Sequence, residues 1–377
     1  MKHLLRRRTS GVSALAFLMA ALFACRPDSG PILIGLAGPF TDSVGAPMLR
    51  AARLAVQQIN GAGGIRGRPV QLVARDDFGD PDSAVSVASY LVGRGVVAVV
   101  GDVYSGTTLA AAPVYNGAGI LQISPSSTAP QLSQAGKWTF RVCPSDVRQA
   151  RALARFAVDR LGLHKGTILY LNTDYGRGLR HMFDEEFSRL GGQIDAEAPY
   201  LAPHPEVAAY LERAARRDRS DFIFLAGNQD EAAAILEQAR TLKIAMPFLG
   251  GDGLEGLQRL GPVGNGTYIS NGYLSDFDSP ENHRFVAEYE TAYPRAGPPS
   301  QAAAATFDVL HLLQREMTWV GTDRRKLRDA VAEVGRQRPA FHGVTGDIAF
   351  DEHGDVPEQR VVIGQVANGA IRAVEGL

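Results

Sequence analysis

The sequence predicts an α/β protein made of two doubly wound lobes, each built on a parallel sheet, and three observations support this fold class. The chain has 377 residues, which corresponds to about two domains at roughly 150 residues each. It is 45% hydrophobic and 21% charged, which is usual for globular proteins and excludes a disordered chain, collagen or a coiled coil. Strand-like runs alternate with helical patterns, and eight or more such units exceed one open sheet.

This alternation is most regular in the first two thirds of the chain. Short runs rich in β-branched residues predict strands at 32–37, 70–75, 96–100, 121–124, 139–142, 167–172, 222–226 and 247–250. Amphipathic segments between them predict helices at 47–60, 81–94, 107–116, 147–161 and 178–190. Because parallel strands need crossover connections, these helices are expected to cover both faces of each sheet.

The last third of the chain has a different pattern. Longer helices are expected at 281–293 and 301–320. The segments 347–350 and 358–366 are expected to pair as a hairpin around His353-Gly354-Asp355.

The charge pattern separates the beginning of the chain from the rest. Residues 1–24 hold four of the 39 Lys and Arg residues and no acid, which leaves 35 basic and 40 acidic side chains in the remainder. A nucleic-acid partner is therefore not expected, because its footprint would be a clustered excess of positive charge.

The first 24 residues have the features of an export signal. The basic start is followed by an apolar run, 12–23, interrupted only by Ser13 and too short to span a bilayer of roughly 30 Å. The run ends at Ala24-Cys25, which resembles a bacterial lipoprotein box whose cysteine is lipidated. The alternative is a simple cleavage site with an unrelated cysteine. We expect 1–24 to be the signal, Cys25 the lipidation site and 25–30 a tether.

Cysteine and histidine usage provides no sign of a disulfide or a metal site. Cys143 is the only other cysteine, so a lipidated Cys25 leaves no intrachain pair. The sequence contains no HxxxH or CxxC motif, and the acidic clusters 76–80 and 351–355 lack the ligand spacing of a calcium loop. These clusters are interpreted as solvated turns, and no metal or cofactor is expected.

Two polar loops follow neighbouring strands of the expected first lobe. Residues 104–108 follow the strand that ends at Val100 and open a helix, which places hydroxyls and unpaired backbone N–H groups at a positive helix end. Residues 124–128 follow the next strand. Ligands of doubly wound sheets bind beyond the carboxyl ends of strands, so this edge predicts a seat for a carboxylate. Ordinary helix caps and turns remain the alternative.

Six motifs in order give the chain a family resemblance. They are Gly38-Pro39-Phe40, 59–67, Arg75-Asp76-Asp77, 124–130, 174–178 and 350–355. The sequence resembles periplasmic solute-binding proteins of the leucine/isoleucine/valine type, the receptor subunits of ABC importers. The resemblance implies two lobes joined by a three-crossing hinge, with crossings near Pro144, Tyr273 and Val356. It divides the chain into lobe 1 (31–144 plus 274–355) and lobe 2 (145–273 plus 356–377).

The resemblance also implies which residues hold the ligand. Ser105, Ser126 and Thr128 match positions that grip the ligand carboxylate and, through acceptors, its amino group. Asp252 matches the carboxylate that pairs with the ligand ammonium, although it could instead cap a helix starting at Leu254.

Further positions depart from the family pattern or have an equally good structural explanation. Tyr175 matches an aromatic residue beside the ligand side chain, and Asn228 stands where leucine-type receptors have tyrosine. Phe307 is either a pocket wall or an ordinary core residue. Gly79 and Tyr104 replace the cysteines of a small family disulfide, so Tyr104 is expected to intrude on the pocket.

The sequence leaves two rival functions open. Residues 251–256 satisfy the G-x-G-x-x-G dinucleotide fingerprint, with Asp276 about 20 residues on, which suggests an exported NAD-dependent oxidoreductase. This motif is not in the first strand–helix unit, and no catalytic residue is placed by a motif. The other rival is a ligand sensor of the same fold that reports to a signalling partner.

The sequence as a whole predicts a binding protein and not an enzyme. We expect a monomeric receptor, lipid-anchored in the periplasm or at the cell surface, that closes two lobes about a small amino acid of the branched-chain type or an analogue. It would deliver this ligand to ABC permease subunits and touch the membrane only through its anchor.

Overall fold

Lobe 1 is built on a five-stranded parallel sheet. The computed structural model describes residues 30–374, so the expected signal, Cys25 and most of the tether lie outside the described residues. In spatial order the strands are β2 (Val70–Asp76), β1 (Ile32–Gly38), β3 (Ala98–Val100), β4 (Leu121–Ser124) and β5 (Thr139–Arg141). In the pair of β1 with the edge strand β2, Ile32 lies opposite Val70 and Gly38 opposite Asp76. The sheet is parallel throughout.

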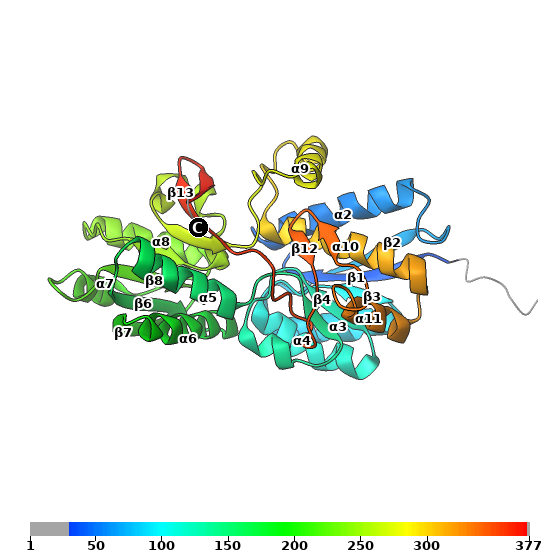
Figure 1. Ribbon diagram of the computed structural model, residues 1–377, viewed down its shortest axis with the longest axis horizontal. Coiled ribbons are helices and arrows are strands. Elements are labelled where there is room, and N and C mark those ends of the chain that lie inside the picture. Colours follow the sequence, from blue (N-terminus) through cyan, green and yellow to red (C-terminus); the bar gives the residue numbers. More distant parts are fainter. Residues whose placement is uncertain (1–29, 375–377) are drawn as a thin grey trace, which may run out of the picture.

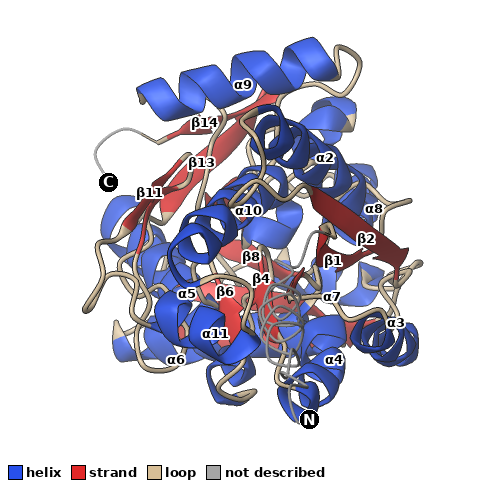
Figure 2. Cartoon of the chain, turned by 90° about the vertical axis from the view of Figure 1, so that its right-hand side faces the viewer, coloured by secondary structure: helices blue, strands red, loops and turns tan. Residues whose placement is uncertain are grey.

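Helices cover both faces of this sheet because successive strand residues point to opposite sides. One face packs on α2 (Gly45–Gly61), α10 (Gln301–Val320) and α11 (Arg324–Ala332). The other packs on α3 (Pro81–Gly93) and α4 (Ser105–Ala118). In β3, Ala98 and Val100 belong to the first core while Val99 belongs to the second. Figure 2 shows α2 and α10 side by side over the first face.

Lobe 2 has a seven-stranded sheet that is parallel except at one edge. In spatial order the strands are β14 (Ala370–Ala373), β13 (Val362–Ala367), β10 (Tyr268–Asn271), β9 (Phe248–Gly250), β8 (Phe222–Ala226), β6 (Lys165–Leu171) and β7 (Gln193–Tyr200). β13 and β14 run antiparallel. One face packs on α5 (Asp146–Arg155) and α6 (Asp174–Arg189), and the other on α7 (Ala208–Ala214) and α8 (Gln229–Thr241).

The chain passes between the lobes three times (Figure 1). The passages lie between β5 and α5, between β10 and α9 (Pro280–Ala292), and between β12 (Gly346–Ile348) and β13. The predicted crossings at Pro144, Tyr273 and Val356 fall within these connections. Val356 itself packs in the core of lobe 1, so the third passage lies closer to β13. The boundaries assigned to the two lobes remain a prediction.

The predicted C-terminal hairpin is wrong. β12 pairs with β11 (Phe341–Gly343), whereas β13 pairs with β10 and β14. Residues between β12 and β13 form a turn held by Asp351, whose Oδ1 accepts hydrogen bonds from the backbone N–H groups of His353 and Asp355, both at 2.9 Å. Asp355 is not simply solvated, because its Oδ1 accepts from Arg141 Nε at 2.6 Å. The segment that resembled a hairpin turn is therefore a turn bonded to β5 of lobe 1, before the third passage begins.

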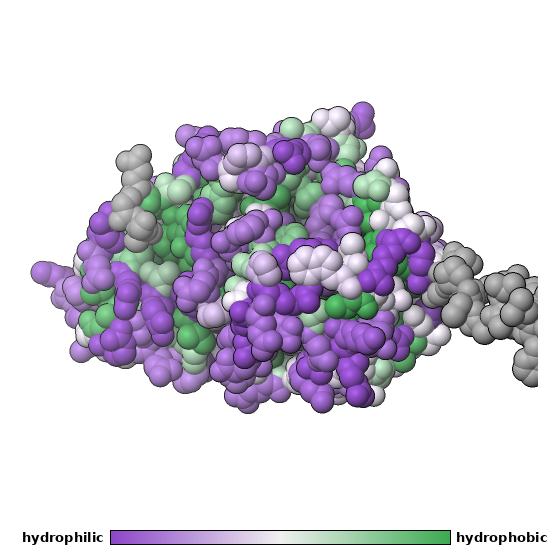
Figure 3. Space-filling view, turned by 45° about the vertical axis from the view of Figure 1, so that its right-hand side comes forward, coloured by the Kyte–Doolittle hydropathy of each residue, from purple (hydrophilic) through white to green (hydrophobic). Residues whose placement is uncertain are grey.

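The face of the molecule in Figure 3 is mostly hydrophilic. On the face in Figure 3, apolar side chains gather in separate patches. Within residues 30–374, no helix combines the length and apolar character needed to cross a bilayer.

Candidate ligand-binding cleft

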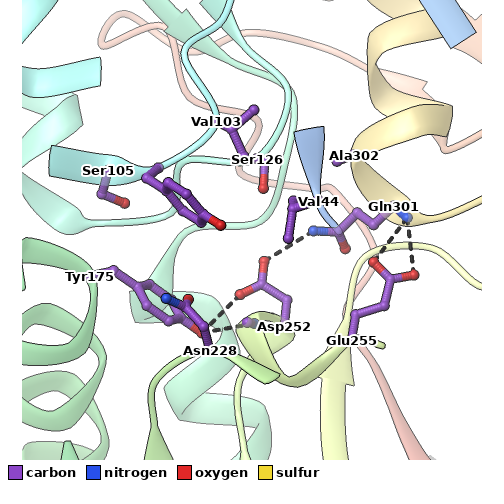
Figure 4. Close-up of a pocket in the computed structure, with 12 residues that line it drawn as sticks. Val44, Val103, Ser105, Ser126, Tyr175, Asn228, Asp252, Glu255, Gln301 and Ala302 are labelled. Carbon is purple, nitrogen blue, oxygen red and sulfur yellow. Dashed lines mark hydrogen bonds between the residues drawn. The ribbon is translucent and has the colours of Figure 1, made fainter. Parts of the chain in front are cut away.

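A small hollow lies between the lobes, at the carboxyl ends of parallel strands from both sheets (Figure 4). We call it the cleft, and define it by the twelve residues that line it: Val44, Val103, Tyr104, Ser105, Ser126, Tyr175, Asn228, Asp252, Gly253, Glu255, Gln301 and Ala302. Its volume is about 50 Å³, compared with roughly 150 Å³ for an engineered cavity that binds benzene. The lobes are therefore close together in this structure.

The wall from lobe 1 presents hydrogen-bond donors. Ser105 is the first residue of α4, and its Oγ accepts from Ala129 N at 3.2 Å, which leaves the hydroxyl proton available. The backbone bond from Thr108 N to Tyr104 O, 3.0 Å, begins the helical pattern, so the N–H groups before Thr108 are those that a helix leaves unpaired. Ser126 is half-buried and lines the same wall.

Thr128 does not line the cleft. It is 1% exposed, and its Oγ1 has no hydrogen-bond partner among the described residues. Its carbonyl oxygen accepts from Asp146 N and Arg141 Nη1, both at 2.8 Å. Thr128 thus lies behind the wall, at the first passage between the lobes, and its direct contact with ligand is not supported by this geometry.

Tyr104 narrows the cleft from the lobe 1 side. Its hydroxyl donates to Asp42 Oδ2 at 2.6 Å, and burial together with the Asp42 charge raises the pKa of the phenol well above its usual range. The ring packs on Gly79, which has φ of 69° and where a Cβ atom would lie 3.0 Å from the ring. Gly79 and Tyr104 are therefore neighbours, as the family disulfide position implied, and the glycine makes room for the ring.

Asp252 is the central polar group of the lobe 2 wall. Its Oδ1 accepts from the Tyr175 hydroxyl at 3.2 Å and its Oδ2 from Gln301 Nε2 at 3.0 Å. The Tyr175 oxygen accepts in turn from Gly253 N at 2.9 Å. Burial raises the pKa of Asp252 to about 6, although these hydrogen bonds favour the charged form.

The sequence did not single out Glu255 and Gln301, which the fold brings into the cleft. Gln301 opens α10 in lobe 1, and its backbone N–H donates to both carboxylate oxygens of Glu255 at 3.1 Å. Burial raises the pKa of Glu255 to about 7. Glu255 lies three residues after Asp252 in the same acidic loop, and this short spacing could have indicated from the sequence that both acids belong to the site. At Gln301 the sequence indicates only a helix and nothing that places its side chain in the cleft.

Another carboxylate lies behind the cleft. Asp146, at the start of α5, is fully buried, and neither of its oxygens has a hydrogen-bond partner among the described residues. Burial, followed by the negative charge of Asp252, raises its pKa to about 8.

The structure decides between the alternatives that the sequence left open at Phe307 and at residues 251–256. Phe307 does not wall the cleft: it packs 4.6 Å from Phe285 and 4.5 Å from His311, between ring centroids, and lines a different hollow. Residues 251–256 do not open a helix. β9 is followed by short 3₁₀ turns, the first at Asp252–Leu254. The dinucleotide fingerprint requires a helix there, as does a cap at Asp252, so both readings fail.

The described part of the chain contains no candidate metal-binding site. No group of three or more His, Cys, Asp or Glu side chains within residues 30–374 is placed to hold a metal ion. Cys143 is buried and free.

Comparison with known proteins agrees with this architecture. A family model described as periplasmic binding protein matches residues 31–370. The chain belongs to the periplasmic binding protein family. It is similar to the Leu/Ile/Val-binding protein homolog 1 of Brucella suis. The two are 28% identical over 333 residues, covering 86% of this chain and 87% of that protein.

Other relatives of this periplasmic binding protein cover the chain more fully. A leucine-, isoleucine-, valine-, threonine- and alanine-binding protein of Pseudomonas aeruginosa is 27% identical over 366 residues, 94% of this chain and 95% of that one. The structure of LivJ from Streptococcus pneumoniae in complex with isoleucine has a TM-score of 0.83 and 28% identity, covering 91% and 99% of the two chains. LivJ is the substrate binding protein of a branched-chain amino acid transporter, and the family implies an extracytoplasmic location.

Proposed function

We propose that this periplasmic binding protein captures a small amino acid, of the branched-chain type or an analogue, and delivers it to an ABC permease. The relatives whose names specify leucine, isoleucine and valine support this ligand class. The proposal includes anchoring to the membrane through lipidated Cys25.

The observation that carries the proposal is the opposition of two kinds of group across the cleft. Asp252 supplies a carboxylate from lobe 2, whereas the start of α4 with Ser105 and Ser126 supplies neutral donors from lobe 1. None of the twelve lining residues is basic. An amino acid in its zwitterionic form matches this arrangement, because its ammonium pairs with the acid and its carboxylate accepts from the donors.

The lobes close because the ligand contacts both of them. A ligand that bridges the walls binds the closed form more tightly than the open form, and it shifts the population by that difference in affinity. The permease would then recognise the closed form. No bond is made or broken in this cycle.

The Asp252→Ala variant tests the ligand class. A thermal-shift screen of residues 26–377 against the twenty L-amino acids first identifies the tightest ligand, since binding raises apparent stability. Calorimetric titration then compares this amino acid with its deaminated carboxylic acid. Loss of one partner from a desolvated charge pair costs about 2–5 kcal/mol, so the variant should bind the amino acid at least about tenfold more weakly.

The deaminated acid is the internal control. It has no ammonium, so its affinity should change little in Asp252→Ala. Equal losses for both compounds would refute the role of Asp252. If no amino acid stabilises the wild-type protein, the proposed function itself is wrong.

A further inference from the structure

Asn228 occupies a helix-cap position without acting as a cap. It follows β8 and is the N-cap residue of α8, yet its side chain makes no capping hydrogen bond. Asparagine is favoured at N-caps because its side-chain oxygen accepts from the N–H groups of the first turn. Helix capping therefore does not explain the asparagine at this position, and its side-chain amide is available to bond another group.

The amide of Asn228 lines the cleft and has no hydrogen-bond partner among the described residues. The side chain is half-buried and is one of those that line the cleft (Figure 4). The two tyrosine hydroxyls of the cleft are already engaged, that of Tyr104 with Asp42 and that of Tyr175 with Asp252 and Gly253. A group of the ligand is left as the partner that would satisfy this amide once the lobes close.

This arrangement discriminates between ligands of the same shape. Closing the cleft over an aliphatic side chain removes water from the amide and puts nothing in its place, which is unfavourable. A hydroxyl or amide on the ligand replaces that water. A purely apolar pocket separates isosteres poorly, whereas a site built to hydrogen-bond a polar group strongly rejects the analogue that lacks it.

Charge and size limit the ligand further. Asp252 and Glu255 both line the cleft, and they disfavour an acidic side chain. The cleft measures about 50 Å³ and Tyr104 intrudes on it, so a short side chain requires the least opening of the lobes.

We infer that this receptor prefers an amino acid with a short, neutral, hydrogen-bonding side chain, of the threonine or asparagine class, and that Asn228 determines this preference. The inference rests on the proposed function and narrows its ligand class. Threonine keeps the branched shape of valine, and asparagine that of leucine, so the shape shared with branched-chain ligands is retained.

Calorimetric titration of residues 26–377 with two isosteric pairs tests the inference. Wild-type protein should bind threonine at least about tenfold more tightly than valine, or asparagine than leucine, which is about 1.4 kcal/mol. Asn228→Leu should abolish or reverse the preference. Asn228→Ala is the second variant, should the leucine variant fail to fold, and it should also reduce the ratio. Asn172→Leu, at an exposed position that bonds Arg177 outside the cleft, should leave the ratio unchanged.

The outcomes separate the inference from the proposed function. Tight binding of valine or leucine, with weaker binding of both polar isosteres, would overturn the inference and support the proposed function. A polar preference that persists in both Asn228 variants would overturn the role of Asn228. Failure of every amino acid in the screen would overturn both.

Discussion

Asp146 is an acid in an environment that disfavours its charge. Its side chain is buried, both carboxylate oxygens lack partners among the described residues, and so does the hydroxyl of nearby Thr128. Its pKa rises from 3.8 to about 8, chiefly through burial. A protonated carboxyl can donate a hydrogen bond where a carboxylate cannot, so the neutral form suits this position beside the cleft.

The Asp146→Asn variant should be more stable than wild type at alkaline pH. Between the unfolded pKa near 3.8 and the folded pKa near 8, the folded state binds more protons than the unfolded state, so wild-type stability falls as pH rises. Asparagine does not titrate and removes this loss. Thermal unfolding should show a gain of at least about 1 kcal/mol at pH 8.5 that shrinks toward pH 4. A difference that stays constant with pH would contradict the assignment.

The start of α10 is the element of lobe 1 that contacts the acidic wall of lobe 2. The Gln301 backbone N–H holds Glu255, a carboxylate at the positive end of the helix. The Gln301 side chain donates to Asp252 and accepts from Gly272 N. Glu255, Asp252 and Gly272 of lobe 2 thus all bond to Gln301 at the start of α10. These contacts bring the two walls of the cleft close together.

Replacing Gln301 with alanine should favour the open form. The change removes two side-chain hydrogen bonds of about 0.5–1.5 kcal/mol each, which shifts the closed–open equilibrium by roughly 5- to 150-fold. Small-angle scattering should give the ligand-free variant a larger radius of gyration than ligand-free wild type. At saturating ligand, the variant and the wild type should have the same radius of gyration. Gln314→Ala, more than three helical turns away along α10 and bonded to His311, is the control. Identical scattering of ligand-free wild type and Gln301→Ala would argue against this role.

At the scale of the whole molecule, the described chain begins at the end of lobe 1 remote from lobe 2 (Figure 1). The carbonyl of Gly30, just before β1, accepts from Arg68 Nε at 2.9 Å. An anchor at Cys25, as proposed, would hold lobe 1 by the end opposite the cleft. Lobe 2 would then be free to move against it during closure.

Cys25→Ser should abolish anchoring. A hydroxyl does not replace the thiol that receives the lipid in a lipoprotein box, so the variant should be released as a soluble protein or remain unprocessed. Cell fractionation and mass spectrometry of the mature N-terminus measure both outcomes. If wild type and variant fractionate alike, and the mature wild-type chain does not begin at Cys25, the lipoprotein assignment is wrong.

The sequence by itself determined the local elements and the order in which they alternate. The run Phe222–Ala226 and the helix Gln301–Val320 match the structure residue for residue, because periodicity and β-branched composition act over a few neighbouring residues. The short motifs that carry the family resemblance are local in the same sense. The family resemblance assigned Ser105, Ser126, Tyr175, Asn228 and Asp252 to one site, and all five line the same cleft.

Only the tertiary structure decided which of these side chains face the cleft and which segments join them. Gln301 reaches Asp252 across 49 positions of sequence, Thr128 turns behind the wall, and β13 pairs with β10 and not with β12. Each of these contacts depends on how two lobes close about three passages of the chain. Sequence periodicity reports the face that a residue presents within its own element, whereas contacts between distant elements are set by packing of the whole molecule.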